Sequence, residues 1–209
     1  MGFRDLKAFN LALLAKQGWH LLQNTNSLFH HVFQAKYFTG RSFLEAQLGK
    51  RPSFAWQSIL AAKCVVEDGI RWSIGNGDKV KIWSDKWIPN PETYKVLTPI
   101  NPLMYNEKVS ALIDKERAVW KSELVNSIFL PHEASTILAI PLSSTLPEDR
   151  RVWSGTTNGV FSVRSAYHVS QKQLSKINVG KRFSQGITYG VEASILLIGA
   201  LCAAAMGSR

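Results

Sequence analysis

Histidine and cysteine are the side chains in which a metal site or a nucleophile would first be sought, and both are sparse. His20, His30 and His31 fall in one helical block, with no carboxylate or cysteine at ligand spacing from them. Cys64 and Cys202 are 138 positions apart and supply neither a zinc ribbon nor a disulfide framework. The sequence therefore predicts no metal site, and a reducing compartment fits the cysteine count.

Carboxylates offer a second route to catalysis, as paired acids or as ligands of reactive cations. Four of them lie in the central part of the chain, at Asp114, Glu116, Glu123 and Glu133. A paired-carboxylate site would need them convergent and desolvated, whereas their scattered spacing is typical of solvated helix faces. We therefore predict no catalytic residue, no cofactor and no enzymatic activity.

Charge is the property that indicates a partner. Lys and Arg number 25 against 15 Asp and Glu in 209 residues, which gives a net charge of +10 and a pI near 9.8. The excess lies at the ends, since residues 1–100 carry +6, residues 101–149 carry −3 and residues 150–209 carry +7. This balance favours anionic partners such as nucleic acid or an acidic membrane face, and the alternative is a set of solvated basic faces.

Five basic residues are the best candidates for contacts with the phosphates of RNA or DNA: Lys36, Arg41, Arg71, Lys79 and Lys81. The last three belong to a predicted β-hairpin. Alternation along its strands would place them on the polar face, opposite the apolar one. Their sign and this shared face lead us to expect weak nucleic-acid binding through charge.

Apolar spacing predicts three helices in the first part of the chain. One covers about residues 5–23 with Asp5 as its N-cap, and a second stops before Gly40. Ser53 is the expected N-cap of the third helix, and Gly69 lies just past its end. Residues 1–69 are therefore expected to form a helical block.

Two β-hairpins are predicted further along, because each pair of alternating segments flanks an Asn-Gly dipeptide that favours a tight turn. The first hairpin joins residues 70–74 to residues 80–83, and the second joins residues 151–154 to residues 160–163. A helix that starts at Ser162 or Ser165 is expected to follow the second hairpin.

The remaining segments complete an α+β chain of short helices and two β-hairpins, without a polymerase palm. A proline-rich connector occupies residues 89–106, and helical spacing recurs over residues 109–113, 119–128 and 133–140. We expect five segments. They are a helical block (residues 1–69), a tryptophan-rich hairpin with its connector (70–100), a group of short helices (101–146), a hairpin followed by a helix (147–174) and a divergent tail (175–209).

Six motifs occur in one order within residues 1–174: Gly2–Leu6, Asn10–Trp19, Ala35–Phe38, Pro52–Trp56, Gly75–Gly77 with Trp83–Pro89, and Gly159–Tyr167. Together they resemble the region downstream of the reverse transcriptase domain in plant non-LTR (LINE-type) retrotransposon polyproteins, which is also met in ribonuclease H-like proteins. The resemblance implies that residues 1–69 follow the polymerase thumb and that residues 147–174 begin a reverse transcriptase zinc-binding domain.

The sequence departs from that family where catalysis would be expected. The family is an RNA-directed DNA polymerase, but its Tyr-x-Asp-Asp aspartates have no counterpart here, and a two-metal site needs them. Zinc ligands are expected after residues 161–163, yet no histidine follows His168 and Cys202 stands alone. Ribonuclease H carboxylates are missing too, since Glu192 is the only acid after Asp149. We therefore expect a non-catalytic fragment of a reverse transcriptase polyprotein.

The tail from about residue 175 departs from the family and supports an alternative function. Its apolar segment, Val191–Met206, has sixteen positions, whereas a bilayer crossing takes about 20 apolar residues. The alternative is a membrane-tethered or purely structural remnant. Residues 1–5 lack the pattern of a secretory signal, so an intracellular location in the nucleus or cytoplasm is favoured, with a membrane left open.

Overall fold

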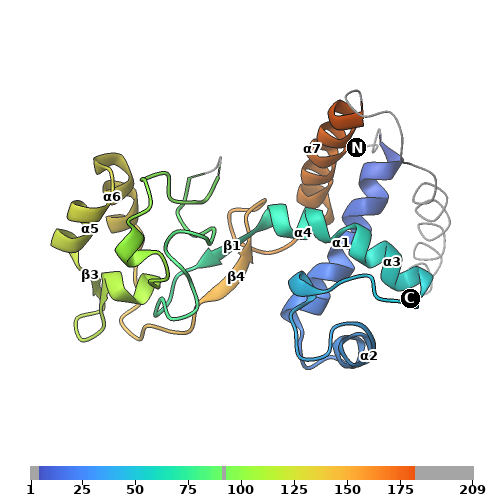
Figure 1. The fold of residues 1–209 in the computed structure, drawn as a ribbon, viewed down its shortest axis with the longest axis horizontal. Coiled ribbons are helices and arrows are strands. Elements are labelled where there is room, and N and C mark those ends of the chain that lie inside the picture. The colour runs from blue at the N-terminus through green and yellow to red at the C-terminus, as the bar shows by residue number, and fades with distance from the viewer. Residues whose placement is uncertain (1–4, 91–92, 182–209) are drawn as a thin grey trace. The chain divides into compact units, whose positions relative to one another are not determined.

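The computed structural model describes residues 5–90 and 93–181, which fall into two compact units. Unit 1 runs through Gly69 and resumes at Gly155, and unit 2 comprises Ile70–Ser154. Helices dominate unit 1, and unit 2 combines short helices with two small antiparallel sheets (Figure 1). The predicted mixture of helix and strand is therefore confirmed.

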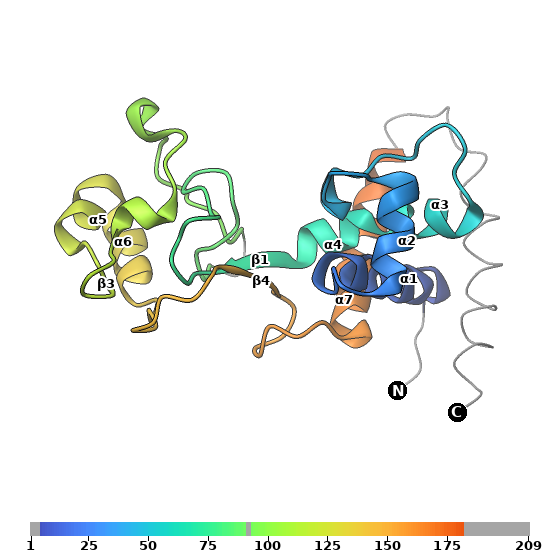
Figure 2. The ribbon, with the colours of Figure 1, turned by 90° about the horizontal axis from the view of Figure 1, so that it is seen from below.

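Unit 1 is built around α1 (Leu6–Gln23), which packs against α7 (Val163–Lys181) and α4 (Lys63–Gly69), as the two views in Figures 1 and 2 show. The Asp5 carboxylate caps α1 by accepting from the backbone of Lys7 and Ala8, as the sequence predicts. The Asp5 N–H in turn donates to the Tyr167 hydroxyl at 3.2 Å, which ties the start of α1 to α7.

A second layer of unit 1 surrounds Trp56. It consists of α2 (Leu28–Tyr37), the short 3₁₀ helix η1 (Phe43–Glu45) and α3 (Phe54–Ala61). The ring of Trp56 is fully buried and stacks on Tyr37 at 4.7 Å between ring centroids, while Phe38 and Phe43 pack around it. Ser27 and Ser53 cap α2 and α3, and the predicted third helix is interrupted at Ala62 before α4 begins.

Unit 2 contains two strand pairs and two helices. β1 (Ile70–Ser73) pairs with β4 (Arg150–Trp153), and β2 (Ile113–Asp114) pairs with β3 (Val119–Trp120), both antiparallel. The helices are α5 (Ser122–Ile128) and α6 (Pro131–Leu138), the latter with Pro131 in its first turn as expected. Two 3₁₀ helices, η2 (Pro102–Met104) and η3 (Val109–Leu112), precede β2.

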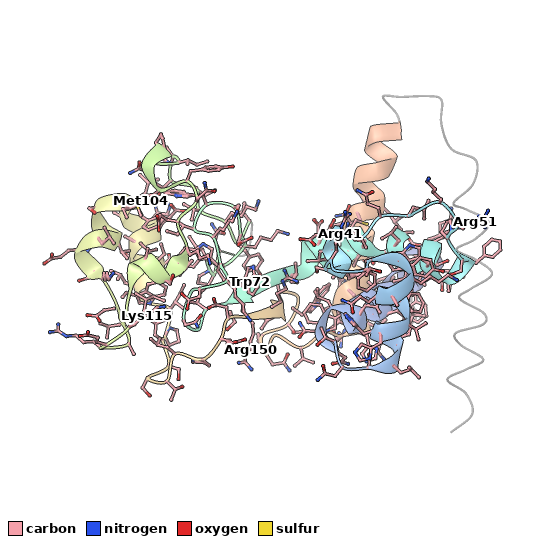
Figure 3. All side chains as sticks on the ribbon, turned by 60° about the horizontal axis from the view of Figure 1, so that its bottom comes forward. Arg41, Arg51, Trp72, Met104, Lys115 and Arg150 are labelled. Atoms are coloured by element: carbon pink, nitrogen blue, oxygen red, sulfur yellow. The ribbon has the colours of Figure 1, made fainter. Side chains whose placement is uncertain are left out.

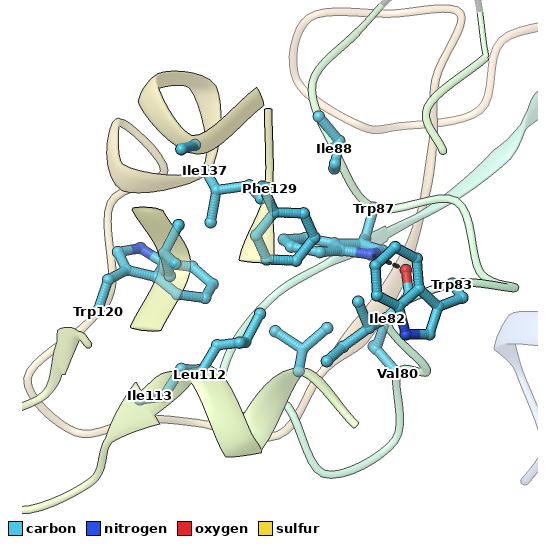
Figure 4. Packing of buried hydrophobic residues seen from close by; sticks show 13 residues of the cluster. Val80, Ile82, Trp83, Trp87, Ile88, Leu112, Ile113, Trp120, Phe129 and Ile137 are labelled. Atoms are coloured by element: carbon cyan, nitrogen blue, oxygen red, sulfur yellow. Dashed lines mark hydrogen bonds between the residues drawn. The ribbon is translucent and has the colours of Figure 1, made fainter. Parts of the chain in front are cut away.

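The core of unit 2 is rich in tryptophan (Figure 4). Trp87 stacks with Trp120 at 6.2 Å, and Trp83 packs on Phe129 at 5.7 Å. The Trp87 indole also donates to the carbonyl of Ile82 at 2.9 Å, so its polar atom is satisfied in the interior. Large aromatic rings, each removing about 150–250 Å² from water, therefore hold together a unit with little regular structure.

Both predicted hairpins are wrong in their pairing. The two segments assigned to different hairpins, residues 70–74 and 151–154, pair with each other, with Ile70 opposite Trp153 and Ser73 opposite Arg150. Residues 160–163 form no strand, although Gly159 has the positive φ of +72° that the turn prediction requires. The helix expected after Ser162 is confirmed as α7.

The physical reason for the altered pairing is the buried carboxylate of Asp149. It accepts backbone hydrogen bonds from Gly75 at 2.7 Å and from Gly77 and Lys79 at 2.9 Å each, so the glycine loop curls around an internal acid. A Cβ on Gly75 would clash with the Pro147 carbonyl, and Gly77 has a φ of +74°. The loop therefore fastens the start of β4 beside β1.

The Glu133 carboxylate likewise accepts hydrogen bonds from the backbone of a segment earlier in unit 2. This carboxylate is buried and accepts from the backbone of Leu97 at 2.6 Å and of Thr98 at 2.9 Å, and also from the Thr98 hydroxyl. The expectation that Glu133 lies on a solvated face is therefore wrong. The proline-rich connector is held to α6 by this acid, because its backbone donors need acceptors once water is excluded.

No helix among residues 5–90 and 93–181 is long and apolar enough to cross a membrane. The predicted apolar segment Val191–Met206 lies outside the residues that the structure describes.

We predict that Asp149→Ala lowers the free energy of unfolding of unit 2 by about 3 kcal/mol, because two buried N–H groups and one part-buried N–H group lose their acceptor. Urea unfolding followed by tryptophan fluorescence measures the change. Glu148→Ala is the matched control. Glu148 is the residue before Asp149, its side chain is 76% exposed, and its carboxylate pairs with Lys79 at the surface. Equal destabilisation by the two variants would contradict the role of Asp149.

Candidate nucleic-acid interface

The five predicted phosphate-contacting residues are divided between the two units. Lys36 and Arg41 belong to unit 1, whereas Arg71, Lys79 and Lys81 belong to unit 2. The shared hairpin face expected for the latter three does not exist, because β1 pairs with β4 and residues 79 and 81 lie outside the named strands. Their contact with nucleic acid stays a prediction, without its original geometric reason.

Two of the three candidates in unit 2, Lys79 and Arg71, have side chains that contact other residues of the protein. The Lys79 ammonium pairs with the Glu148 carboxylate at 2.7 Å, which holds the pKa of Glu148 below its ordinary value. The Arg71 guanidinium lies over the ring of Tyr94, 5.8 Å from its centroid. Lys81 is exposed, and its backbone N–H donates to the Asp85 carboxylate at 2.7 Å.

The division into units also divides the charge. Residues 70–154 contain 11 Lys and Arg against 10 Asp and Glu, a net charge of +1. The residues of unit 1 contain the other 14 basic groups and 5 acidic ones, a net charge of +9. Nearly all of the positive excess of the sequence therefore falls within the residue ranges assigned to unit 1.

Exposed cations of unit 1 recur along the chain from the end of α2 to the start of α3. Lys36, Arg41, Lys50 and Arg51 are all exposed, and we call these four residues the α2–α3 surface; Figure 3 labels Arg41 and Arg51. The sequence analysis did not select Lys50 and Arg51. Two adjacent basic residues near the selected Lys36 and Arg41 could, however, have been recognised in the sequence.

A hydrogen bond brings the two ends of this connection together. The Tyr37 hydroxyl donates to Ser53 Oγ at 2.7 Å, and the Ser53 backbone N–H donates to the Tyr37 oxygen at 3.3 Å. Lys36 therefore lies one residue from one end of the tether, and Arg51 lies two residues from the other. The bond to Ser53 and the nearby Lys36 ammonium hold the pKa of Tyr37 below its ordinary value.

The connection is held in place from within. Trp56 donates its indole N–H to the Gln47 carbonyl at 3.3 Å, and the Lys63 ammonium donates to the Ala46 carbonyl at 3.2 Å. Glu45, the one acid in residues 38–53, forms a capping box with Ser42 and accepts from its N–H at 3.1 Å. Its carboxylate is thus engaged locally, so the surrounding surface stays positive.

Two apolar side chains are exposed beside these cations. Phe54, the first residue of α3, is 71% exposed, and Leu48 is 49% exposed. Cations interspersed with an exposed aromatic ring are typical of surfaces that bind nucleic-acid strands through phosphates and base stacking.

The acidic and sulfur-containing side chains of the described residues are the remaining candidates for chemistry. There, no group of three His, Cys, Asp or Glu side chains is placed to hold a metal ion. The buried acids Asp149 and Glu133 accept backbone hydrogen bonds, as described above. Burial raises the pKa of the Cys64 thiol, which disfavours a reactive thiolate.

Comparison with known proteins gives two similarities, both from Arabidopsis thaliana. A protein named "Uncharacterized mitochondrial protein" is 38% identical over 103 residues, which are 49% of this chain and 63% of that protein. One named "Putative ribonuclease H protein" is 30% identical over 173 residues, which are 81% of this chain and 28% of that protein. The chain thus spans less than two thirds of each relative.

No protein-family model matches the chain, and no solved structure matches it. The two similarities support a retrotransposon-related protein, in agreement with the coarse form of the resemblance found in the sequence. They do not identify the region of a polyprotein to which the chain corresponds.

We expect Ser53→Ala to raise the pKa of Tyr37 towards its ordinary value, because the variant removes a hydroxyl that can turn and donate to the ionised phenolate. Carbon-13 NMR of labelled tyrosine across an alkaline titration measures this change. Ser27→Ala is the control, since it removes the equivalent N-cap from α2 without touching the Tyr37 hydroxyl. An unchanged Tyr37 titration in Ser53→Ala would show that the tether is absent in solution.

Proposed function

We propose that the chain is a retrotransposon-derived protein without catalytic activity, which binds RNA or DNA through the α2–α3 surface. In this proposal it corresponds to the region that follows a LINE-type reverse transcriptase domain and leads into the zinc-binding domain. Its function is to hold a nucleic-acid strand by its phosphates.

The observation that carries the proposal is the uneven charge of the two units. Unit 1 has a net charge of +9, unit 2 has +1, and four exposed cations of unit 1 lie along one connection that is braced by buried aromatic rings. Lys and Arg on such a surface displace condensed counterions from a polyanion, which favours association without reading the base sequence. Binding is therefore expected to be strong at low salt and weak at high salt.

The proposal of a non-catalytic role is supported by what the acids of the fold do. Phosphoryl transfer by two metals needs carboxylates that face a shared cation. Asp149 and Glu133, which are buried, direct their oxygens at backbone N–H groups instead. The activity in the name of the longer relative is said of that protein, of which this chain covers 28%.

Filter binding to a duplex oligonucleotide over a salt series tests the proposal. The triple variant Arg41→Gln, Lys50→Gln, Arg51→Gln is expected to weaken binding on the order of tenfold or more at low salt. Its slope of log K against log salt should be shallower by about 2–3, since each phosphate contact contributes about 0.9 on duplex DNA.

The matched control carries the same change in net charge on unit 2, through Lys95→Gln, Lys108→Gln and Arg117→Gln. All three of these residues are exposed. The control is expected to keep most of the affinity and slope of the parent protein. Equal losses in both triple variants, or binding by the parent that ignores salt, would refute the assignment to the α2–α3 surface.

A further inference from the structure

Unit 2 contains an open groove that the proposed function does not use. It has a volume of about 590 Å³ and lies between β1 and the end of α6. The residues that line it are Arg71, Trp72, Ser73, Ile74, Trp87, Pro89, Ser135, Thr136, Ala139, Ile140 and Pro141. Pockets for small organic ligands fall in the range of about 300–1,000 Å³, so the groove can hold one nucleotide.

One wall of the groove presents an oriented cation. The Arg71 guanidinium lies over the ring of Tyr94, 5.8 Å from its centroid. A guanidinium that stacks on a ring can still donate hydrogen bonds through its in-plane N–H groups. None of the described residues that line the groove carries a carboxylate. An anion with several oxygens, such as a phosphate, is therefore the group that complements this wall.

An aromatic residue of β1 also lines the groove. Trp72 follows Arg71 in β1 and lines the groove with Ile74 and the edge of the buried Trp87. Its ring is held by the Arg151 guanidinium, which lies 4.9 Å from the ring centroid and comes from the residue opposite it in β4. A flat apolar ring complements such a surface, because stacking on tryptophan is favourable for every base.

The opposite wall offers hydrogen-bond acceptors. Ser135 Oγ donates to the Pro131 carbonyl and Thr136 Oγ1 donates to the His132 carbonyl, each at 2.8 Å. The hydroxyl protons are thus directed into α6, and the oxygen lone pairs remain to accept from a ligand. Ribose hydroxyls and the amino groups of bases are donors of this kind.

We propose that this groove binds an unpaired nucleotide, with its base against Trp72 and its phosphate on Arg71. A base inside a duplex cannot reach the groove, since it is stacked between its neighbours. The site therefore favours single strands. It lies on a different unit from the α2–α3 surface and does not depend on it for binding.

Titration of the full chain with adenosine 5′-monophosphate, followed by the shifts of tryptophan indole N–H signals in NMR, tests the proposal. Ala139→Trp should fill the groove, because Ala139 is exposed and lines it. We expect this variant to bind the nucleotide at least tenfold more weakly. Ser127→Trp is the matched control, because Ser127 is exposed on α5 and does not line the groove, and it should bind like the parent.

Partial ligands test the two halves of the site. Adenosine lacks the phosphate and ribose 5-phosphate lacks the base, so each should bind at least fivefold more weakly than the complete nucleotide. Arg71→Gln should remove the preference for the nucleotide over adenosine and leave adenosine binding unchanged. Absence of saturable nucleotide binding in the parent, or equal binding by Ala139→Trp and Ser127→Trp, would overturn the proposal.

Nucleotide binding in the groove can be tested independently of the proposed function. The triple variant Arg41→Gln, Lys50→Gln, Arg51→Gln should bind adenosine 5′-monophosphate like the parent, even if its affinity for a duplex is lost. Loss of nucleotide binding in that variant would place the nucleotide on unit 1 and overturn the groove as its site.

Discussion

The arrangement of unit 2 depends on the burial of the Asp149 carboxylate among backbone N–H groups. A buried anion must be hydrogen-bonded, and here the donors come from a loop 70 to 74 positions earlier in the chain. The loop can approach only because Gly75 and Gly77 lack side chains. Once it has closed on Asp149, β4 lies beside β1, with Arg151 opposite Trp72 and its guanidinium 4.9 Å from the centroid of the Trp72 ring.

Acidic and basic residues have different roles in this structure. Buried acids hold the connections of unit 2 together, as Asp149 does for the glycine loop and Glu133 does for the proline-rich connector. The four cations of the α2–α3 surface are exposed, and the Lys36 ammonium lies over the Tyr37 ring, 5.3 Å from its centroid. Exposed cations of this kind are the feature on which the proposed binding of phosphates rests.

Local features of the fold could be predicted from the sequence, and long-range ones could not. The caps at Asp5 and Ser53 and the helix after Ser162 follow from interactions within a few residues, and the structure confirms them. The Asn-Gly pairs favoured local hairpins, but the competing partner of β1 lies almost 80 residues away. Nothing near Glu133 in the sequence indicates that it accepts from residues 97 and 98. Lys50 and Arg51 were readable as a doublet, whereas the groove beside Trp72 requires the tertiary structure.

In the proposed function, the cations of the α2–α3 surface hold a polyanion. Lysine acetylation footprinting of the full chain, with and without duplex DNA at low salt, tests it residue by residue. Lys36 and Lys50 should be protected from acetylation by the duplex, and Lys95 and Lys108 on unit 2 should react at unchanged rates. Protection confined to unit 2, or no protection of Lys36 and Lys50 at saturating DNA, would contradict the account.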